Sequence, residues 1–203
     1  MDDDPSLPPD DQLPPDDRPD AAVSDRALSL ANEAMFTVDL QVRRVRGHEP
    51  EDEVFVLRWW ADLQFLIVAL RRLRRAAQLG LHGLEETRAA IDGAIKAFDE
   101  DLPDLTVMRN VGEHIDDYAR GRGRHREVRP GGLQVGGFDG TTFRWLNREP
   151  TIDEAEGPDR ELNIDEAKRA AGRLYLAVRA AIKSAIRAER VRLWRVAAGS
   201  PTS

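Results

Sequence analysis

The sequence of 203 residues contains no cysteine. This absence excludes disulfide bonds and zinc–thiolate sites, and it fits a reducing compartment. The chain also has no apolar run long enough to cross a membrane, because residues 65–70 are flanked by Asp62 and Arg71. Its acidic start lacks the basic and then apolar segments of a signal peptide. We therefore expect a cytoplasmic protein with no membrane partner.

Several signatures of enzymes and metal sites are also missing. There is no glycine-rich phosphate loop, no Ser/His/Asp order and no cysteine nucleophile. A metal site from Glu113, His114 and Asp117 is disfavoured, because the chain lacks the Glu-x-x-His pair of di-iron bundles. A winged helix–turn–helix is disfavoured as well, since no short helix pair is predicted beside the strands. The sequence thus predicts no metal and no cofactor.

The net charge of −7 is concentrated at the start of the chain. The first twenty residues hold eight Asp and one Arg, and six of the twelve prolines lie within residues 1–22. Such a segment has too little apolar surface to pack, so we expect residues 1–22 to form a disordered acidic tail. The neutral remainder, residues 23–200, is long enough for one domain with its own core.

Apolar side chains recur at helical spacing through most of this remainder. The sequence therefore predicts an all-α fold, a bundle of four to five long helices. The second helix has two apolar faces, which implies burial on two sides, either within a bundle or at a homodimer contact. The expected helices span residues 24–46, 52–79, 84–99, 105–120 and 164–194, with caps at Ser24 or Asp25, at Asp104 and at Asn163.

A non-helical insertion is expected at about residues 121–162, before the last helix. Strand-forming residues between 131 and 146 flank Asp139-Gly140, which is a strong signal for a hairpin turn. Residues 147–161 are polar and predict a loop. The insertion begins with a basic run that contains Arg120, Arg122, Arg124 and Arg126.

The stretch from Met108 to Tyr118 gathers the side chains best suited to chemistry. On one continuous helix, Asn110, His114 and Asp117 would share a stripe, and Arg109 would pair with Glu113 one turn later. Gly112 is costly inside a helix and suggests the close approach of another group. The core face of this helix would be formed by Met108, Val111, Ile115 and Tyr118.

The segment Arg109-Asn110-Val111-Gly112-Glu113-His114 resembles the Arg-polar-x-x-x-His motif of HEPN-domain proteins. The family consists of helical bundles, often dimeric, and many members are metal-independent ribonucleases of toxin–antitoxin, phage-defence and RNA-processing systems. Two features depart from it: residues 121–162 are longer than a minimal version needs, and Tyr118 follows His114 by four residues. In the subgroup silenced by nucleotidylation, the tyrosine follows the histidine by two.

The resemblance implies a metal-independent endoribonuclease that uses the 2′-hydroxyl of RNA as nucleophile. His114 would act as general acid or base, Arg109 would stabilise the phosphorane, Asn110 would orient His114 or the phosphate, and Glu113 would hold Arg109. The basic run would contact the RNA backbone. The expected partners are RNA, a second copy in a homodimer and a co-encoded antitoxin.

The alternative is a non-catalytic helical module that binds RNA or protein. An Arg–His pair buried in intramolecular ion pairs would favour this module, whereas an exposed pair facing its mate across a dimer groove would favour the ribonuclease.

Overall fold

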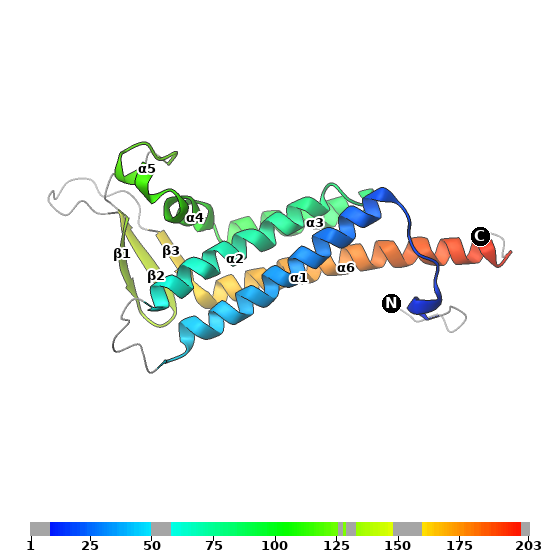
Figure 1. The fold of residues 1–203 in the computed structure, drawn as a ribbon, viewed down its shortest axis with the longest axis horizontal. Coiled ribbons are helices and arrows are strands. Elements are labelled where there is room, and N and C mark those ends of the chain that lie inside the picture. Colours follow the sequence, from blue (N-terminus) through cyan, green and yellow to red (C-terminus); the bar gives the residue numbers. More distant parts are fainter. Residues whose placement is uncertain (1–8, 50–57, 126–127, 129–132, 148–159, 200–203) are drawn as a thin grey trace.

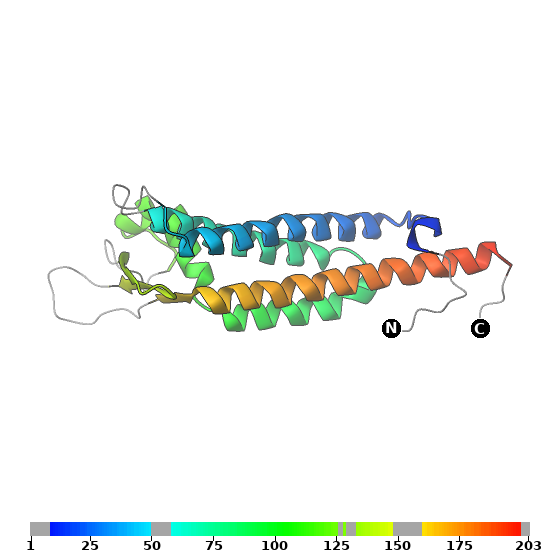
Figure 2. The ribbon, with the colours of Figure 1, turned by 90° about the horizontal axis from the view of Figure 1, so that it is seen from below.

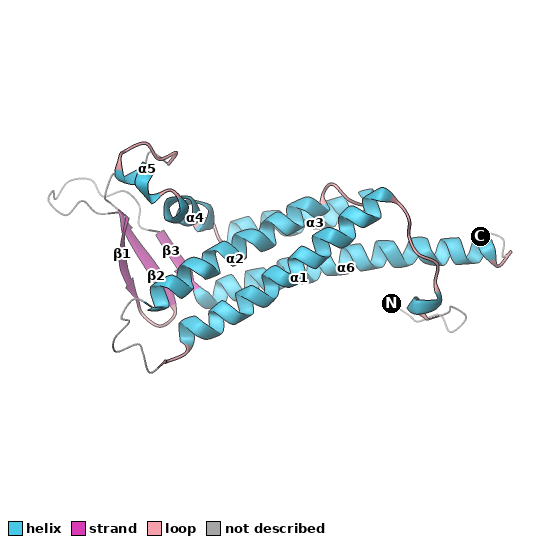
Figure 3. Cartoon of the chain, in the orientation of Figure 1, coloured by secondary structure: helices cyan, strands magenta, loops and turns pink. Residues whose placement is uncertain are grey.

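The computed structural model describes residues 9–49, 58–125, 128, 133–147 and 160–199. Four long helices lie side by side along the molecule: α1 (Pro19–Arg46), α2 (Arg58–Gly80), α3 (Glu85–Asp101) and α6 (Ile164–Ala197) (Figures 1 and 2). The short helices α4 (Leu105–Glu113) and α5 (Ile115–Ala119) and a small sheet lie at one end of this bundle (Figure 3). These elements confirm the predicted helical bundle with a small β insertion before the last helix. No helix in the described segments combines the length and apolar character that a membrane span requires.

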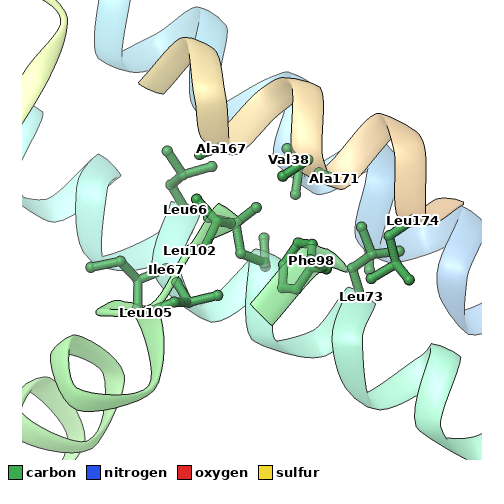
Figure 4. Close-up of a cluster of buried hydrophobic side chains, with 14 of the residues drawn as sticks. Val38, Leu66, Ile67, Leu73, Phe98, Leu102, Leu105, Ala167, Ala171 and Leu174 are labelled. Atoms are coloured by element: carbon green, nitrogen blue, oxygen red, sulfur yellow. The ribbon is translucent and has the colours of Figure 1, made fainter. Parts of the chain in front are cut away.

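The core is formed where the four long helices meet (Figure 4). Leu66 and Leu73 from α2 and Phe98 from α3 are fully or almost fully buried there. Alanines on α6 allow that helix to approach closely, and burial of each large side chain contributes about 1.5–3 kcal/mol. The same core continues into α4 through Leu105, Met108 and Val111. Helix α4 is therefore anchored by its apolar face.

Helix α1 begins at Pro19, ahead of the cap predicted at Ser24 or Asp25. Proline suits the first helical turn, where its missing N–H would have no partner. Ser24 lies inside α1 and is fully buried, and its Oγ accepts a hydrogen bond from the backbone N–H of Leu84 at 3.0 Å. A Cβ atom on Gly83 would lie 2.1 Å from that Oγ, so this close turn into α3 requires glycine.

Residues 9–22 contact the bundle, although the sequence predicted a disordered tail for residues 1–22. A short 3₁₀ helix, η1 (Asp10–Gln12), precedes Leu13, which is only 5% exposed. The guanidinium of Arg190 on α6 donates to the carbonyl oxygens of Leu13 and Pro14 at 2.6 and 2.7 Å. One leucine and two backbone acceptors thus dock a segment whose composition is otherwise typical of disorder. Residues 1–8 lie outside the described part of the chain.

The sheet has three antiparallel strands in the order β1-β2-β3. Strands β1 (Leu133–Phe138) and β2 (Thr142–Asn147) form the predicted hairpin. Strand β3 (Arg160–Asn163) begins within the predicted loop 147–161 and ends at the predicted cap Asn163. Aromatic contacts join the sheet to the start of α2: Trp59 stacks on Phe138 at 6.0 Å, and Trp60 lies 5.4 Å from Trp145. The sheet therefore covers the end of the bundle next to α4.

Of the two residues predicted to cap α6 and α4, Asn163 forms a cap and Asp104 does not. Asn163 caps α6 as predicted, because its Oδ1 accepts from the N–H groups of Asp165 and Glu166 at 3.0 Å. Asp104 makes no capping hydrogen bond to α4. Its carboxylate instead accepts from Arg160 Nη1 at 2.7 Å and from the N–H of Glu161 at 3.2 Å. This contact ties the start of α4 to β3.

Candidate functional site

The predicted helix 105–120 is interrupted at His114, which separates α4 from α5. His114 has φ −128° and ψ 37°, and its N–H still closes α4 by donating to the carbonyl of Asn110. Gly112 lowers local helix stability by about 1 kcal/mol relative to alanine, which favours a break nearby. The predicted single core face is wrong at Ile115, which is 63% exposed, while Met108, Val111 and Tyr118 are buried.

A chain of polar contacts runs along α4 and into the basic run. Arg109 forms an ion pair with Glu113, as the spacing predicted, and its Nη1 donates to Asn110 Oδ1 at 3.0 Å. The side-chain amide of Asn110 lies 3.1 Å from His125 Nε2. The ring of His125 stacks on Tyr118, with centroids 6.4 Å apart. Asn110 therefore contacts His125, where the sequence predicted that it would orient His114 or the phosphate.

This chain of contacts fixes the tautomer of His125. A guanidinium only donates hydrogen bonds, so Asn110 must present its oxygen to Arg109 and its Nδ2–H to the imidazole. The Nε2 of His125 then accepts, and the ring proton lies on Nδ1. A hydrogen on Nε2 would remove this contact with Asn110.

A polar pocket of about 270 Å³ collects most of the residues that the sequence proposed. Arg109, Asn110 and His114 line it from α4 and the break, and Asp117 and Tyr118 line it from α5. Arg122 and Arg124 from the basic run complete the wall. The fold thus brings three guanidinium groups and one imidazole to one concave surface.

Further cations surround the start of α4. Arg71 on α2 donates from Nη1 to Thr106 Oγ1 at 3.1 Å. Its pKa is lowered, mainly by burial and further by the neighbouring charges of Arg74, Arg75 and Arg109. An anion bound beside Arg109 would relieve this repulsion. Three arginines at the polar pocket outnumber the two carboxylates paired with them, Glu113 beside Arg109 and Asp117 beside Arg122. The remaining positive charge favours a negatively charged ligand.

The close approach predicted at Gly112 involves a side chain of the same protein. A Cβ atom on Gly112 would lie 2.6 Å from Gln64 Oε1, at the far end of a flexible side chain. A similar contact packs the basic run, where a Cβ atom on Gly123 would lie 2.3 Å from the ring of Tyr118. Glycine at 123 therefore lets the loop lie flat against α5.

Three of the predicted site residues, Glu113, Arg120 and Arg126, are not part of the polar pocket as the structure describes it. Glu113 lies on the side of α4 away from this pocket and serves as the partner of Arg109. Arg120 is exposed and does not line the pocket, and Arg126 lies outside the described residues. Within the described segments, no group of three or more His, Cys, Asp or Glu residues is arranged to hold a metal ion.

The two main residues of the motif meet different environments. The side chain of Arg109 is 18% exposed and engaged in an intramolecular ion pair, which is the arrangement expected of a non-catalytic module. His114 is exposed at the pocket, which is the arrangement expected of a catalytic group. His125 was not among the predicted site residues. Its place in the basic run, next to Arg124, was the only signal available.

Comparison with protein-family models, with curated proteins and with solved structures gives no match.

Proposed function

We propose that the protein is a metal-independent endoribonuclease of the HEPN type that acts in the cytoplasm. The observation that supports this proposal is the pocket lined by Arg109, Asn110 and His114 together with Arg122 and Arg124. The motif supplies an imidazole and a guanidinium, and the basic run adds two further cations on the same surface. This set suits a phosphodiester whose own 2′-hydroxyl is the nucleophile.

The proposed reaction is an internal transesterification. His114 takes the proton of the 2′-hydroxyl, and the freed oxygen attacks the adjacent phosphorus. The bond from phosphorus to the 5′-oxygen breaks, and that oxygen receives a proton from solvent or from the protonated imidazole. The products are a 2′,3′-cyclic phosphate and a 5′-hydroxyl end. Arg109 stabilises the negative charge that develops on the phosphorane.

The other polar residues position these two groups. Glu113 holds the guanidinium of Arg109 from one side, and Asn110 holds it from the other. His125 fixes Asn110 through its Nε2 and is itself stacked on Tyr118. Binding of a phosphate would require Arg109 to share its donors between Glu113 and the substrate. A guanidinium has five N–H donors, which allows this sharing.

The second candidate function is a non-catalytic module that binds RNA or protein. The observation that favours it is the ion pair between Arg109 and Glu113, which already satisfies part of the guanidinium. Under this alternative, the same basic pocket binds a phosphate backbone without cleaving it. The two functions differ only in the chemistry at His114, so a cleavage assay separates them.

The partners in this proposal are RNA, a second copy of the chain and a co-encoded antitoxin. Phe36 and Leu40 lie one turn apart on α1 and are 69% and 38% exposed, which offers an apolar surface for a homodimer. Light scattering at micromolar concentration tests this part of the proposal. If the protein is a monomer at that concentration, the homodimer is rejected, and the proposal for the polar pocket is unaffected.

The test of the proposed activity is RNA cleavage by the purified protein and its variants. His114→Ala should reduce the rate about 10²- to 10⁴-fold, the usual range for loss of acid–base catalysis. Arg109→Ala should reduce it about 10²- to 10³-fold, the usual range for loss of one group that stabilises charge in the transition state. Glu113→Gln should cost less, because it removes only a partner of Arg109. His82→Ala is the matched control, since His82 is exposed on the turn after α2.

Cleavage should persist with a chelator, and a substrate carrying 2′-deoxyribose at the cut site should resist. If wild type and His114→Ala cleave at the same rate, or if wild type cleaves no RNA, the enzyme is rejected in favour of the binding module.

A further inference from the structure

A second pocket adjoins α4 and has a different character. Its volume is about 340 Å³, which falls within the range of about 300–1,000 Å³ typical of small-molecule sites. It lies between α2, the α4–α5 break and strand β2. Its walls are mainly apolar and aromatic, and they include Trp60, Phe65, Val68, Val111, Ile115 and Trp145.

Trp145 carries an unused hydrogen-bond donor at this pocket. Its side chain is 3% exposed, and its Nε1–H has no acceptor among the described residues. A buried donor without a partner is unfavourable and uncommon, because indole N–H groups normally find an acceptor when they are buried. The indole N–H is covered by neighbouring atoms, and a bound molecule that displaces them would satisfy this donor.

Two aromatic faces accompany this donor. Trp60 lies 5.4 Å from Trp145, and Phe65 is 60% exposed although Leu66 and Ile67 beside it on α2 are buried. Gln64, Arg109 and Glu113 add polar groups to the lining. A flat ring with an acceptor on its edge matches this combination, whereas an aliphatic chain would leave the indole N–H without a partner.

Arg109 connects this pocket to the polar one, because it lines both. A phosphate held at Arg109 in the polar pocket would have its neighbouring nucleotide beside the aromatic pocket. We infer that the aromatic pocket binds one nucleobase of single-stranded RNA, next to the phosphate that is cleaved. The assignment rests on the proposed function, since RNA is the ligand that places a base beside Arg109.

The chemistry of binding follows from the lining. The base stacks on the exposed ring of Phe65 and against the half-buried ring of Trp60, as unpaired bases do on aromatic side chains in RNA-binding proteins. Trp145 Nε1–H donates to a ring nitrogen or carbonyl oxygen on the edge of the base. Stacking gives affinity for any base, and the hydrogen bond requires an acceptor at one position.

The experiment uses mononucleotides, which contain no bond that the proposed enzyme would cleave. Indole N–H resonances are recorded by NMR on the full chain, whose four tryptophans give four signals. Adenosine 5′-monophosphate and cytidine 5′-monophosphate should shift the Trp145 signal, which is identified from its loss in Trp145→Phe. Ribose 5-phosphate carries the same phosphate without a base and should leave this signal unchanged.

Two variants test the contacts separately. Phe65→Ala should weaken nucleotide binding roughly 5- to 150-fold, the range measured for loss of one stacking contact. Leu176→Ala is the matched control, because Leu176 is also exposed but lies on α6 and does not line the pocket. Trp145→Phe keeps an aromatic ring and removes the N–H, and it should weaken binding about 2- to 12-fold. If Trp145→Phe does not fold, the loss of nucleotide affinity in Phe65→Ala, measured against its control, carries the test.

The outcomes separate this inference from the proposed activity. A base-dependent shift of the Trp145 signal that Phe65→Ala weakens supports the base site, whether or not RNA is cleaved. An unmoved signal, equal effects of ribose 5-phosphate and nucleotide, or full binding by Phe65→Ala overturns it. RNA cleavage together with any of these three results would support the proposed ribonuclease and reject the base-binding pocket.

Discussion

Asp62 provides the clearest prediction about stability. Its side chain is 3% exposed and accepts from Arg44 Nε at 2.8 Å and from Arg58 Nη1 at 3.0 Å. Arg58 also donates to the carbonyl oxygens of Arg44 and Gly47, which end α1. Asp62 therefore links the end of α1 to the start of α2.

The substitution Asp62→Asn keeps the shape of this side chain and removes its charge. Loss of one partner from a buried ion pair costs about 3–5 kcal/mol, because the other charge stays buried. Arg58 is 14% exposed but keeps the carbonyl oxygens of Arg44 and Gly47 as acceptors, so the cost lies at the lower end of this range. Arg44 is 52% exposed and can be hydrated. We expect a loss of about 3 kcal/mol, which corresponds to a fall in Tm of about 6–12 °C for a domain of this size.

Urea denaturation followed by far-UV circular dichroism measures this loss. The matched control is Lys96→Gln, which removes an exposed ion pair with Asp92 on α3 and should change stability much less. In double-mutant cycles, Arg58→Gln should couple more strongly to Asp62→Asn than Arg44→Gln does. A loss below about 1 kcal/mol for Asp62→Asn, equal to that of the control, would refute the role of burial in this pair.

Two further predictions concern the N-terminal segment. Deletion of residues 1–8 should leave the Tm unchanged. Deletion of residues 1–18 should lower the Tm, because it removes the buried Leu13 and the carbonyl oxygens that accept from Arg190. Equal Tm values for the two deletions would show that the segment does not dock. The hydrogen bond from Arg18 holds the pKa of Asp16 below its ordinary value of 3.8. Since the folded pKa is depressed, Asp16 stabilises the protein above pH 3.8, and this contribution disappears as pH falls through the folded pKa. The stability difference between wild type and Asp16→Asn should therefore shrink in acid, and a constant difference would contradict this cause.

Periodicity was sufficient to predict the four long helices of the bundle, and the capping-box sequence at residues 163–166 predicted the Asn163 cap. It failed where a tertiary contact replaced a local one. Asp104 had the right position for a cap, but a nearby guanidinium on β3 is a stronger partner for a carboxylate than a backbone N–H. Ser24 likewise serves the start of α3, and this partner lies sixty residues away in the chain. Single-sequence reasoning has no access to such partners.

The candidate site was predicted in part. The pairing of Arg109 with Glu113 followed from helical spacing, and it is present. The contact of Asn110 with His125 did not follow, because it depends on how residues after α5 fold back over Tyr118. The break at His114 was missed because the helical pattern continued through it, and the exposed Ile115 is the result. The aromatic pocket needed the sheet to be placed against α2, which no local pattern specifies.

The length of α6 has a consequence for the dynamics of the molecule. Its buried side chains end at Ile182, while the helix continues to Ala197 beyond the other long helices (Figure 1). Amide hydrogens before Ile182 can exchange with solvent only when the bundle opens, so they should report the global free energy of unfolding. Those after Ile182 should exchange by local fraying, with protection that falls toward the C-terminal end. Around Arg190 the docked N-terminal residues should slow this exchange. Amide exchange along this one helix would therefore report both the global free energy of unfolding and the free energy of local fraying.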